Sequence, residues 1–251
     1  MSQLRAVFWD VDGTLADTEM DGHRPAFNAA FAELDVPIVW EPELYADLLS
    51  IPGGLRRVRI HAERLGLSLS ESKLSELRDR KRAHYLRRVR DGHVSWRPGV
   101  LRLLRDLDES GIQQWVVTSS GLASVSALLE AGRKLLPNFE GIVSSDDVSE
   151  GKPAPDGYLR ALELSGWNPA EVLAVEDSAA GLQAASAANL RAVVTPSPWD
   201  DDLKQLLSTA AAAFDHLGEP GRPAKLLSGP PCPEGQVTLG YLKSLLAESN
   251  R

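Results

Sequence analysis

The stretch LRAVFWDVDGT, residues 4–14, decides the fold, because an apolar run there ends abruptly in two acids and a turn. Residues 4–9 are short, apolar and rich in strand formers, which predicts a buried strand. Asp10 and Asp12 stand in alternate positions, so their side chains point to the same side of the chain. The glycine and threonine that follow begin a turn, whose backbone N–H groups can surround an anion. Two acids can also cap a helix, but after so apolar a run we expect a strand end that presents two carboxylates.

Further apolar runs predict the rest of a sheet. Strand signals lie at residues 113–117, 141–143, 172–175 and 192–194, and helical patterns lie between them at residues 100–107, 123–130, 157–165 and 179–188. Strand and helix alternate, with turn residues between them, which is typical of a parallel sheet with helices on both faces. The predicted class is therefore α/β, with a doubly wound, mostly parallel, Rossmann-like core sheet.

The alternation is interrupted after the first strand. Residues 19–93 carry only helical patterns: Phe27 and Phe31 share one apolar face, and a charged helix covers roughly residues 70–90. No strand signal returns until after the Arg-Pro-Gly of residues 97–99. This block therefore indicates an all-α domain inserted into the core.

The chain is thus predicted to have three parts. They are a Rossmann-like core of residues 1–18 and 94–214, a helical cap of residues 19–93, and a C-terminal tail of residues 215–251 packed on or near the core. The tail is rich in glycine and proline and ends in a short amphipathic helix at residues 239–246. We assign no function to it.

Composition and charge exclude several classes of protein. The 251 residues are 43% hydrophobic and 25% charged, as in an ordinary globular chain of one large domain or one domain with an insert. A formal charge of −8 argues against a general nucleic-acid binder, and no stretch is apolar enough to cross a membrane. The single cysteine, Cys232, cannot make an internal disulfide and gives no support for a zinc site. No leader-like segment opens the chain, so we expect a cytoplasmic location, or an organelle stroma if a transit peptide has been removed; a monomer is expected.

The net charge conceals an asymmetry. Residues 56–90 hold 12 basic and 4 acidic side chains, a balance of +8, which leaves 15 basic and 31 acidic side chains, or −16, for the rest of the chain. A basic segment in an acidic protein is either a solvated helical face or an anion-binding surface. Its position inside the helical cap leaves both interpretations open.

Small hydroxyl and basic residues follow the second and third predicted strands. Ligands in doubly wound sheets bind beyond the carboxyl ends of the strands, so these positions are candidates for a site. Thr118 and Ser119 precede a helix and suit phosphate oxygens, although such residues are also ordinary helix caps. Lys152 lies in a loop with two prolines, which restrict the backbone around it. Either signal alone is weak.

The fourth predicted strand ends in a second pair of acids. Glu176 and Asp177 directly follow the apolar run of residues 172–175. Adjacent carboxylates are costly to hold beside a sheet unless a cation compensates them. The edge of the sheet is therefore predicted to gather four carboxylates, a lysine and hydroxyl groups.

Together these four strand ends resemble the motifs of the haloacid dehalogenase superfamily. Residues 10–14 are similar to its first motif, Asp-x-Asp-Gly-Thr, Thr118 to its second, Lys152 to its third, and residues 176–177 to its fourth. The resemblance covers the chain from residue 4 to about residue 196, and the helical insert lies where this family carries its small C1-type cap.

This resemblance implies a Mg²⁺-dependent phosphatase. The implied magnesium ligands are Asp10, the backbone carbonyl of Asp12, Asp177, and Glu176 either directly or through water. Asp10 would attack phosphorus and become an aspartyl phosphate, and Asp12 would act as general acid and then general base. Lys152 would neutralise Asp10 and a phosphoryl oxygen, and Thr118 would bind another.

Two cap segments also resemble the CbbY branch of this superfamily, whose members are sugar-bisphosphate phosphatases. They are residues 17–28 and the Ser-Ile-Pro-Gly-Gly of residues 50–54, which is followed by Arg56 and Arg57. The implied reaction converts xylulose 1,5-bisphosphate to xylulose 5-phosphate and so removes an inhibitor of Rubisco. Trp9 departs from the pattern, because the branch commonly has phenylalanine directly before the nucleophile.

A bisphosphate requires a second anion site, which the cap could supply. The candidate substrate-binding residues are Glu19, His23, Arg24, Gly53, Gly54, Arg57 and Lys81 in the cap and Ser119 in the core. Each cap arginine could equally be a solvated surface residue, His23 a structural histidine and Glu19 a favourable residue at a helix start. Three other functions remain open: a β-phosphoglucomutase-like phosphoryl transfer, a phosphoglycolate-type monophosphatase, and an inactive protein that binds a phosphorylated metabolite.

Overall fold

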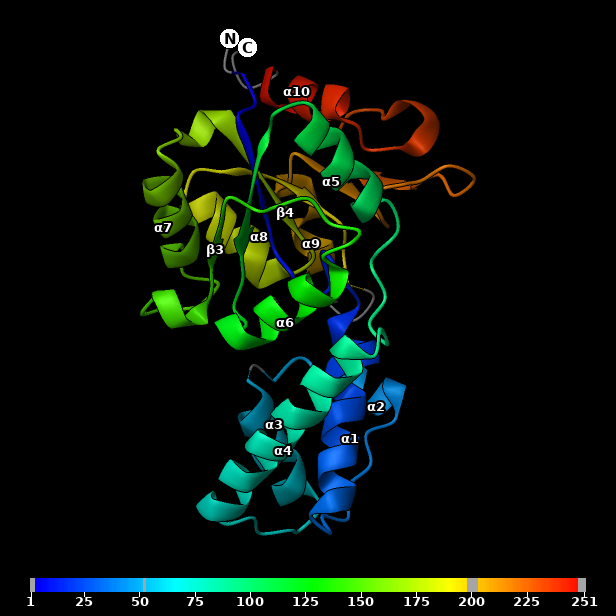
Figure 1. Cartoon of the computed structure of the whole chain (residues 1–251), viewed down its shortest axis with the longest axis vertical. Helices are drawn as coiled ribbons and strands as arrows, with labels where there is room; N and C mark the ends of the chain where they lie inside the picture. The colour runs from blue at the N-terminus through cyan, green and yellow to red at the C-terminus, as the bar shows by residue number, and fades with distance from the viewer. Residues whose placement is uncertain (1–2, 52, 198–202, 248–251) are drawn as a thin grey trace. The chain divides into compact units, whose positions relative to one another are not determined.

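The computed structural model describes residues 3–51, 53–197 and 203–247, and within them a seven-stranded sheet forms the centre of the core (Figure 1). In the order β3-β2-β1-β4-β5-β6-β7, the strands are Gly141–Val143, Gln113–Val117, Ala6–Trp9, Val172–Glu176, Arg191–Val194, Ala212–Phe214 and Leu226–Ser228. All neighbouring strands are parallel except β7, which runs antiparallel to β6. The prediction of a doubly wound, mostly parallel sheet is confirmed.

Strand β1 lies in the interior of the sheet and is buried on both faces. Its four residues are wholly buried, as expected for a parallel strand covered by helices. Trp9 is in register with Val116 of β2 and Val175 of β4, so the three strands end at the same level. The residues after these strands are thereby brought to one edge of the sheet.

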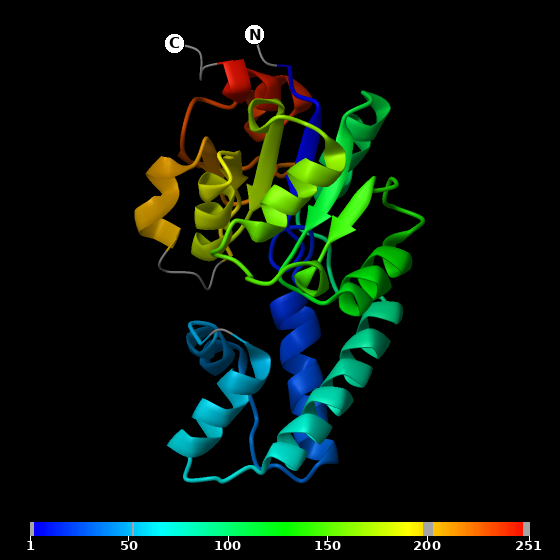
Figure 2. The same ribbon diagram turned by 90° about the vertical axis from the view of Figure 1, so that its left-hand side faces the viewer.

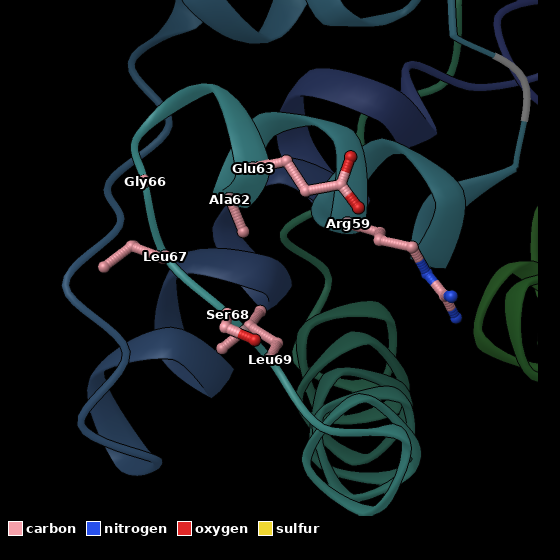
Figure 3. A pocket seen from close by; sticks show the side chains of 7 residues that line it. All are labelled: Arg59, Ala62, Glu63, Gly66, Leu67, Ser68 and Leu69. Atoms are coloured by element: carbon pink, nitrogen blue, oxygen red, sulfur yellow. The ribbon is translucent and has the colours of Figure 1, made fainter.

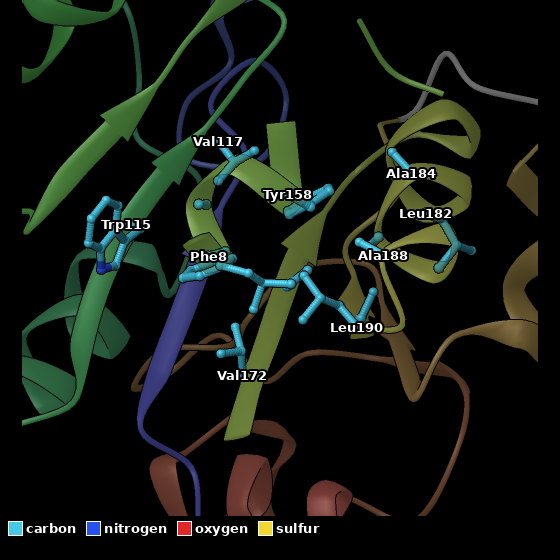
Figure 4. Close-up of a cluster of buried hydrophobic side chains, with 14 of the residues drawn as sticks. Phe8, Trp115, Val117, Tyr158, Val172, Leu182, Ala184, Ala188 and Leu190 are labelled. Atoms are coloured by element: carbon cyan, nitrogen blue, oxygen red, sulfur yellow. The ribbon is translucent and has the colours of Figure 1, made fainter. Parts of the chain in front are cut away.

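Helices cover the core sheet. They are α5 (Val100–Glu109), α6 (Leu122–Gly132), α7 (Asp156–Ser165), α8 (Ala179–Ala187), α9 (Leu203–Leu206) and α10 (Leu239–Ala247). Phe8 and Trp115 belong to an apolar cluster that also contains residues of α7 and α8 (Figure 4). Side chains alternate along a strand, so Val7 and Trp9 point to the opposite face. Burial of both faces makes the sheet a firm support for the loops at its edge.

The segment after residue 214, predicted as a tail packed on or near the core, adds a strand and a helix to the core unit. β7 extends the sheet, and α10 buries Tyr241 and Leu242. Arg102 of α5 donates hydrogen bonds to the carbonyl oxygens of Leu217 and Val237, at 3.1 and 2.8 Å. The strand prediction omitted β6, which ends an alanine-rich run that favours a helix as much as a strand, and β7, whose three residues are half-exposed or exposed.

The cap is a helical unit of residues 17–95, and the remaining residues form the core unit. A π-helical turn (Thr18–His23) leads into α1 (Arg24–Glu33), followed by α2 (Pro42–Leu48), α3 (Gly54–Arg64) and α4 (Glu71–Arg90). Helices α1 and α4 pack against each other, and Figure 2 shows them side by side. The predicted apolar face of α1 is buried in an aromatic cluster of Phe27, Phe31, Trp40 and Tyr45. None of the helices in the described part of the chain is long and apolar enough to span a membrane.

Candidate active site

The edge of the sheet brings together the core residues predicted from the four motifs. Asp10 directly follows β1, and its backbone N–H donates to the carbonyl oxygen of Val175 at 3.0 Å. Thr118 directly follows β2, and its N–H donates to the carbonyl oxygen of Val143 at 2.9 Å. These bonds continue the sheet ladder by one residue, so the side chains of Asp10 and Thr118 start from a rigid backbone.

Three buried carboxylates form the centre of the site. Asp10, Glu176 and Asp177 each place one carboxylate oxygen within 4.8 Å of the others. Their exposed fractions are 6%, 0% and 6%. Lys152 enters this cluster from the loop after β3, and its Nζ lies 2.7 Å from Asp10 Oδ1 and 2.6 Å from Glu176 Oε1. The lysine therefore binds the predicted nucleophile and one predicted metal ligand at once.

The cluster has more negative than positive charge. Burial raises the pKa of Asp10 to about 7, although the nearby Lys152 charge opposes the rise. Burial also raises the pKa of Asp177 well above its usual range, with a further contribution from the Asp10 charge. In addition, Glu176 Oε2 has no hydrogen-bond partner among the described residues. A further cation would offset this excess of negative charge and stabilise the ionised carboxylates.

Two glycines allow the Asp177 and Glu176 carboxylates to approach the backbone closely. A Cβ atom at Gly13 would collide with the Asp177 carboxylate, and one at Gly181 would collide with that of Glu176. Both acids are thus pressed against glycines, which holds their oxygens in the cluster. Closely spaced carboxylates with backbone carbonyls nearby are the donors that a hard divalent cation such as Mg²⁺ prefers. The residues present fit that ion.

Asp12 lies beside this cluster and is held by a residue that the sequence analysis did not select. Ser120 Oγ donates a hydrogen bond of 2.5 Å to Asp12 Oδ2, and Ser120 N–H donates to Thr118 Oγ1 at 3.0 Å. Ser119, the predicted binding residue, is exposed. In a run of Thr-Ser-Ser the spacing alone does not tell which hydroxyl turns inward, so this contact required the structure.

Tyr158 of α7 is a second residue that the sequence analysis missed. Its hydroxyl donates to Glu176 Oε1 at 2.5 Å, and Lys152 Nζ lies 5.3 Å from its ring centroid. The residue is wholly buried, with Ala161 and Leu162 on the same face of the helix. That i, i+3, i+4 spacing indicated a core position, and a buried tyrosine requires a polar partner. The partner itself could not be read from the sequence.

In the cap, Glu19 and Arg57 are joined through a tyrosine. Tyr45 Oη donates to Glu19 Oε2 at 2.5 Å and accepts a hydrogen bond of 3.1 Å from Arg57 Nη1. Arg57 Nε also donates to the carbonyl oxygen of Leu48 at 2.9 Å, and the residue is only 6% exposed. The Arg57 side chain is therefore buried and hydrogen-bonded within the cap rather than exposed to solvent.

His23 and Lys81 form a second pair of predicted residues. Lys81 Nζ lies 2.9 Å from His23 Nδ1, and the His23 ring stacks on Tyr85 with centroids 4.3 Å apart. Lys81 Nζ also lies 4.9 Å from the centroid of the Phe27 ring. The aromatic rings hold the two basic groups together at one place in the cap.

The remaining predicted cap residues have structural contacts. Arg24 Nη1 donates to the carbonyl oxygen of Trp40 at 3.2 Å. Gly53 has φ +83° and precedes α3, whose first residue is Gly54. A Cβ atom at Gly54 would meet the Phe27 ring at 2.9 Å. Pro52, in the same motif, lies outside the described residues.

The cap also contains a hollow at the C-terminal end of α3 (Figure 3). Its volume is about 320 Å³, and it is lined by Arg59, Ala62, Glu63, Gly66, Leu67, Ser68 and Leu69. The lining includes no predicted site residue. The chemistry of the four motifs therefore lies elsewhere, at the edge of the core sheet.

Comparison with known proteins gives consistent matches over the region of the motifs. The family model for haloacid dehalogenase-like hydrolases matches residues 4–189. Protein CbbY of Rhodobacter capsulatus is 42% identical over 199 residues, which cover 78% of this chain and 87% of that protein. The plasmid-encoded Protein CbbY of Cupriavidus necator is 37% identical over 228 residues, or 88% of each chain. A crystal structure of mutant CbbY from Rhodobacter sphaeroides in complex with xylulose-(1,5)bisphosphate has a TM-score of 0.70 and 33% identity, covering 80% of this chain and 89% of that one.

Proposed function

Because this chain belongs to the haloacid dehalogenase-like hydrolase family and is a phosphatase, we propose that it removes one phosphate from a small sugar bisphosphate through a phosphorylated Asp10. The observation that carries the proposal is the position of Asp10, at the end of the interior strand β1 and 2.7 Å from Lys152 Nζ. A carboxylate in that position is both a nucleophile and the partner of a fixed positive charge.

Asp10, Glu176 and Asp177, with the backbone carbonyl of Asp12, would hold a Mg²⁺ ion at this site. When bound, the ion supplies positive charge that allows a carboxylate to approach a phosphate dianion. Lys152 contributes a second positive charge, and its contact with Glu176 at 2.6 Å fixes it beside the nucleophile. The two charges together offset the repulsion between the reacting anions.

Asp10 attacks phosphorus in line with the departing sugar oxygen and forms an acyl phosphate. The Thr118 hydroxyl lies at the end of the neighbouring strand and would donate to a phosphoryl oxygen. Asp12 protonates the departing alkoxide and then removes a proton from the water that hydrolyses the intermediate. Ser120, which donates to Asp12 Oδ2, keeps that carboxylate oriented toward the reacting atoms.

Xylulose 1,5-bisphosphate is the substrate we propose. A structural relative that is 33% identical to this chain has been solved with that compound. The His23–Lys81 pair in the cap provides adjacent basic groups for a second phosphate. Arg57 and Tyr45 would act differently, by orienting Glu19 toward a sugar hydroxyl.

Phosphate release with Mg²⁺ across a substrate panel tests this proposal. The panel contains xylulose 1,5-bisphosphate, ribulose 1,5-bisphosphate, β-glucose 1,6-bisphosphate and phosphoglycolate. We expect the highest kcat/KM for the xylulose compound. A preference for phosphoglycolate, or phosphoryl transfer between glucose phosphates without phosphate release, would instead support the monophosphatase or the mutase.

A pair of cap variants separates the second phosphate site from general charge. Lys81→Gln should raise KM for the bisphosphate about tenfold or more and leave p-nitrophenyl phosphate hydrolysis nearly unchanged, because only the bisphosphate has a second anion. Arg82→Gln is the matched control, since Arg82 is an exposed basic residue of the same helix. Equal effects of the two variants would refute the proposed role of the His23–Lys81 pair.

A further inference from the structure

Arg97 is a buried arginine at the edge of the core sheet that carries the candidate active site. It has no role in the proposed mechanism. The residue precedes α5, where the chain returns from the cap, and it is 7% exposed. A buried guanidinium requires hydrogen-bond acceptors, because an unpaired charge away from water is strongly destabilising. The hydrogen-bond acceptors of Arg97 therefore indicate the role of this charge.

Arg97 donates to backbone carbonyls of three separate loops. The acceptors are Gly13, Thr195 at 3.1 Å, Pro196 at 3.3 Å and Asp215 at 3.1 Å. Gly13 belongs to the turn that carries Asp10 and Asp12, and the other acceptors follow β5 and β6. A planar guanidinium can bind several fixed acceptors at once, which a lysine ammonium cannot reproduce.

The Gly13 peptide links Arg97 to the acidic cluster. Gly13 has φ +84°, and a Cβ atom there would collide with the Asp177 carboxylate. Its N–H donates to the carbonyl oxygen of Ala16 at 2.9 Å, so the turn is closed on itself. Arg97 thus holds the carbonyl of the same residue against which Asp177 packs.

We propose that Arg97 is a positioning residue that fixes the Gly13 turn, and through it the Asp12 carbonyl and the Asp177 carboxylate, for binding a divalent cation. The inference rests on the metal-dependent phosphatase proposed above. It assigns Arg97 no contact with the substrate.

Arg102 provides a matched control within the chain. It lies on α5 and donates to the carbonyl oxygens of Leu217, Gly218 and Val237, at 3.1, 3.0 and 2.8 Å. Both arginines tie the segment after β6 to the core through backbone carbonyls, but Arg97 also donates to the carbonyl oxygen of Gly13. Loss of either bond set should loosen that segment, whereas loss of Arg97 should also disturb the site.

The test compares Arg97→Met, Arg97→Lys and Arg102→Met in the full chain. Mg²⁺ affinity is measured by titration calorimetry without substrate, and kcat and KM are measured with p-nitrophenyl phosphate. We expect Arg97→Met to weaken Mg²⁺ binding and lower kcat by about 10–100-fold, the usual effect of removing a partner that orients a metal ligand. KM should change little, millimolar guanidinium should restore part of the activity, and Arg102→Met should stay within about twofold of the wild type.

Two results would overturn the inference: wild-type Mg²⁺ affinity in Arg97→Met, or an equal loss in Arg102→Met. If Arg97→Met does not fold, as judged by circular dichroism, Arg97→Lys decides, because it keeps the charge without the fork and should bind Mg²⁺ less tightly than the wild type. The calorimetry uses no sugar phosphate. Failure of the proposed substrate would therefore be distinguishable from failure of the Arg97 role.

Discussion

At the scale of single residues, the contact of Lys152 with two carboxylates explains how a buried aspartate can serve as a nucleophile. Burial alone would lower the pKa of Lys152, but the charges of Asp10 and Glu176 outweigh it and raise the pKa above its usual value. The lysine therefore stays protonated and keeps a positive charge beside Asp10. Tyr158 donates to the same Glu176 oxygen and completes the support of that acid.

The two aspartates of the first motif should respond unequally to removal of their charge. Asp10→Asn should abolish turnover, since an amide cannot accept the phosphoryl group, whereas Asp12→Asn should lower kcat by about 10²–10⁴-fold. Phosphate release from xylulose 1,5-bisphosphate measures both. The control is Asp108→Asn, an exposed aspartate of α5. Equal residual activity in the two site variants would contradict the assigned roles.

At the scale of elements, the aromatic cluster of the cap contains a histidine that is kept neutral. Trp40 Nε1 donates to His61 Nδ1 at 3.0 Å, across the contact between the Trp40 loop and α3. Burial lowers the pKa of His61, and the nearby Arg64 charge lowers it further. A protonated His61 could not accept the Trp40 hydrogen bond.

The cap should therefore lose stability in mild acid. Because the pKa of His61 is lowered in the folded state, its contribution to the free energy of unfolding is full above pH 6.5, its ordinary pKa. That contribution is lost as the pH falls through the pKa that His61 has in the folded protein. His61→Gln keeps an acceptor without a titrating group. Between pH 7.5 and 5, the wild type should lose about 1 kcal/mol more unfolding free energy than this variant, the typical value of one hydrogen bond. Parallel denaturation curves at both pH values would contradict this account.

The elements of the site differ in how far they could be predicted from the sequence. The strand before Asp10 is an unbroken apolar run, and strands of that kind end where the polar residues begin, so its position could be predicted. β7 could not, because its three residues are half-exposed or exposed and depend on pairing with β6. Ser120 and Arg97 were missed for a related reason: each acts on a residue about a hundred positions away, at Asp12 and Gly13.

At the scale of the whole molecule, the basic residues of the cap differ in their surroundings. Arg80 and Arg59 form exposed ion pairs with Glu33 and Glu71, at 3.2 and 2.8 Å. Such pairs contribute little to stability, so these arginines belong to a solvated face. Lys81, which lies against His23 and aromatic rings, is the part of the basic segment that suits an anion.

Mg²⁺ should stabilise the protein, and more so at high pH. The pKa of Asp10 is about 7 in the folded protein, against an ordinary 3.8, so folding favours the protonated acid. Its contribution to the free energy of unfolding is therefore full below pH 3.8 and is lost as the pH rises through 7. A divalent cation compensates the ionised cluster, so magnesium at 100 times its Kd should add about 2.7 kcal/mol. Thermal unfolding with and without Mg²⁺ should show a larger shift at pH 8 than at pH 5. An equal shift at both pH values, or a full shift in Asp10→Asn, would contradict this.

The interior place of β1 also governs the order in which the enzyme can assemble on the ribosome. β1 ends at Trp9, but its partners β2 and β4 begin only at Gln113 and Val172. The strand with the nucleophile therefore waits for about a hundred residues, or roughly 5–20 s of synthesis, before its first neighbour exists. During that time the backbone N–H and C=O groups on both edges of β1 are unpaired, and its apolar side chains are uncovered, so the strand is open to association with other chains. A chain released before residue 176 would carry the nucleophile without the two acids that complete its site.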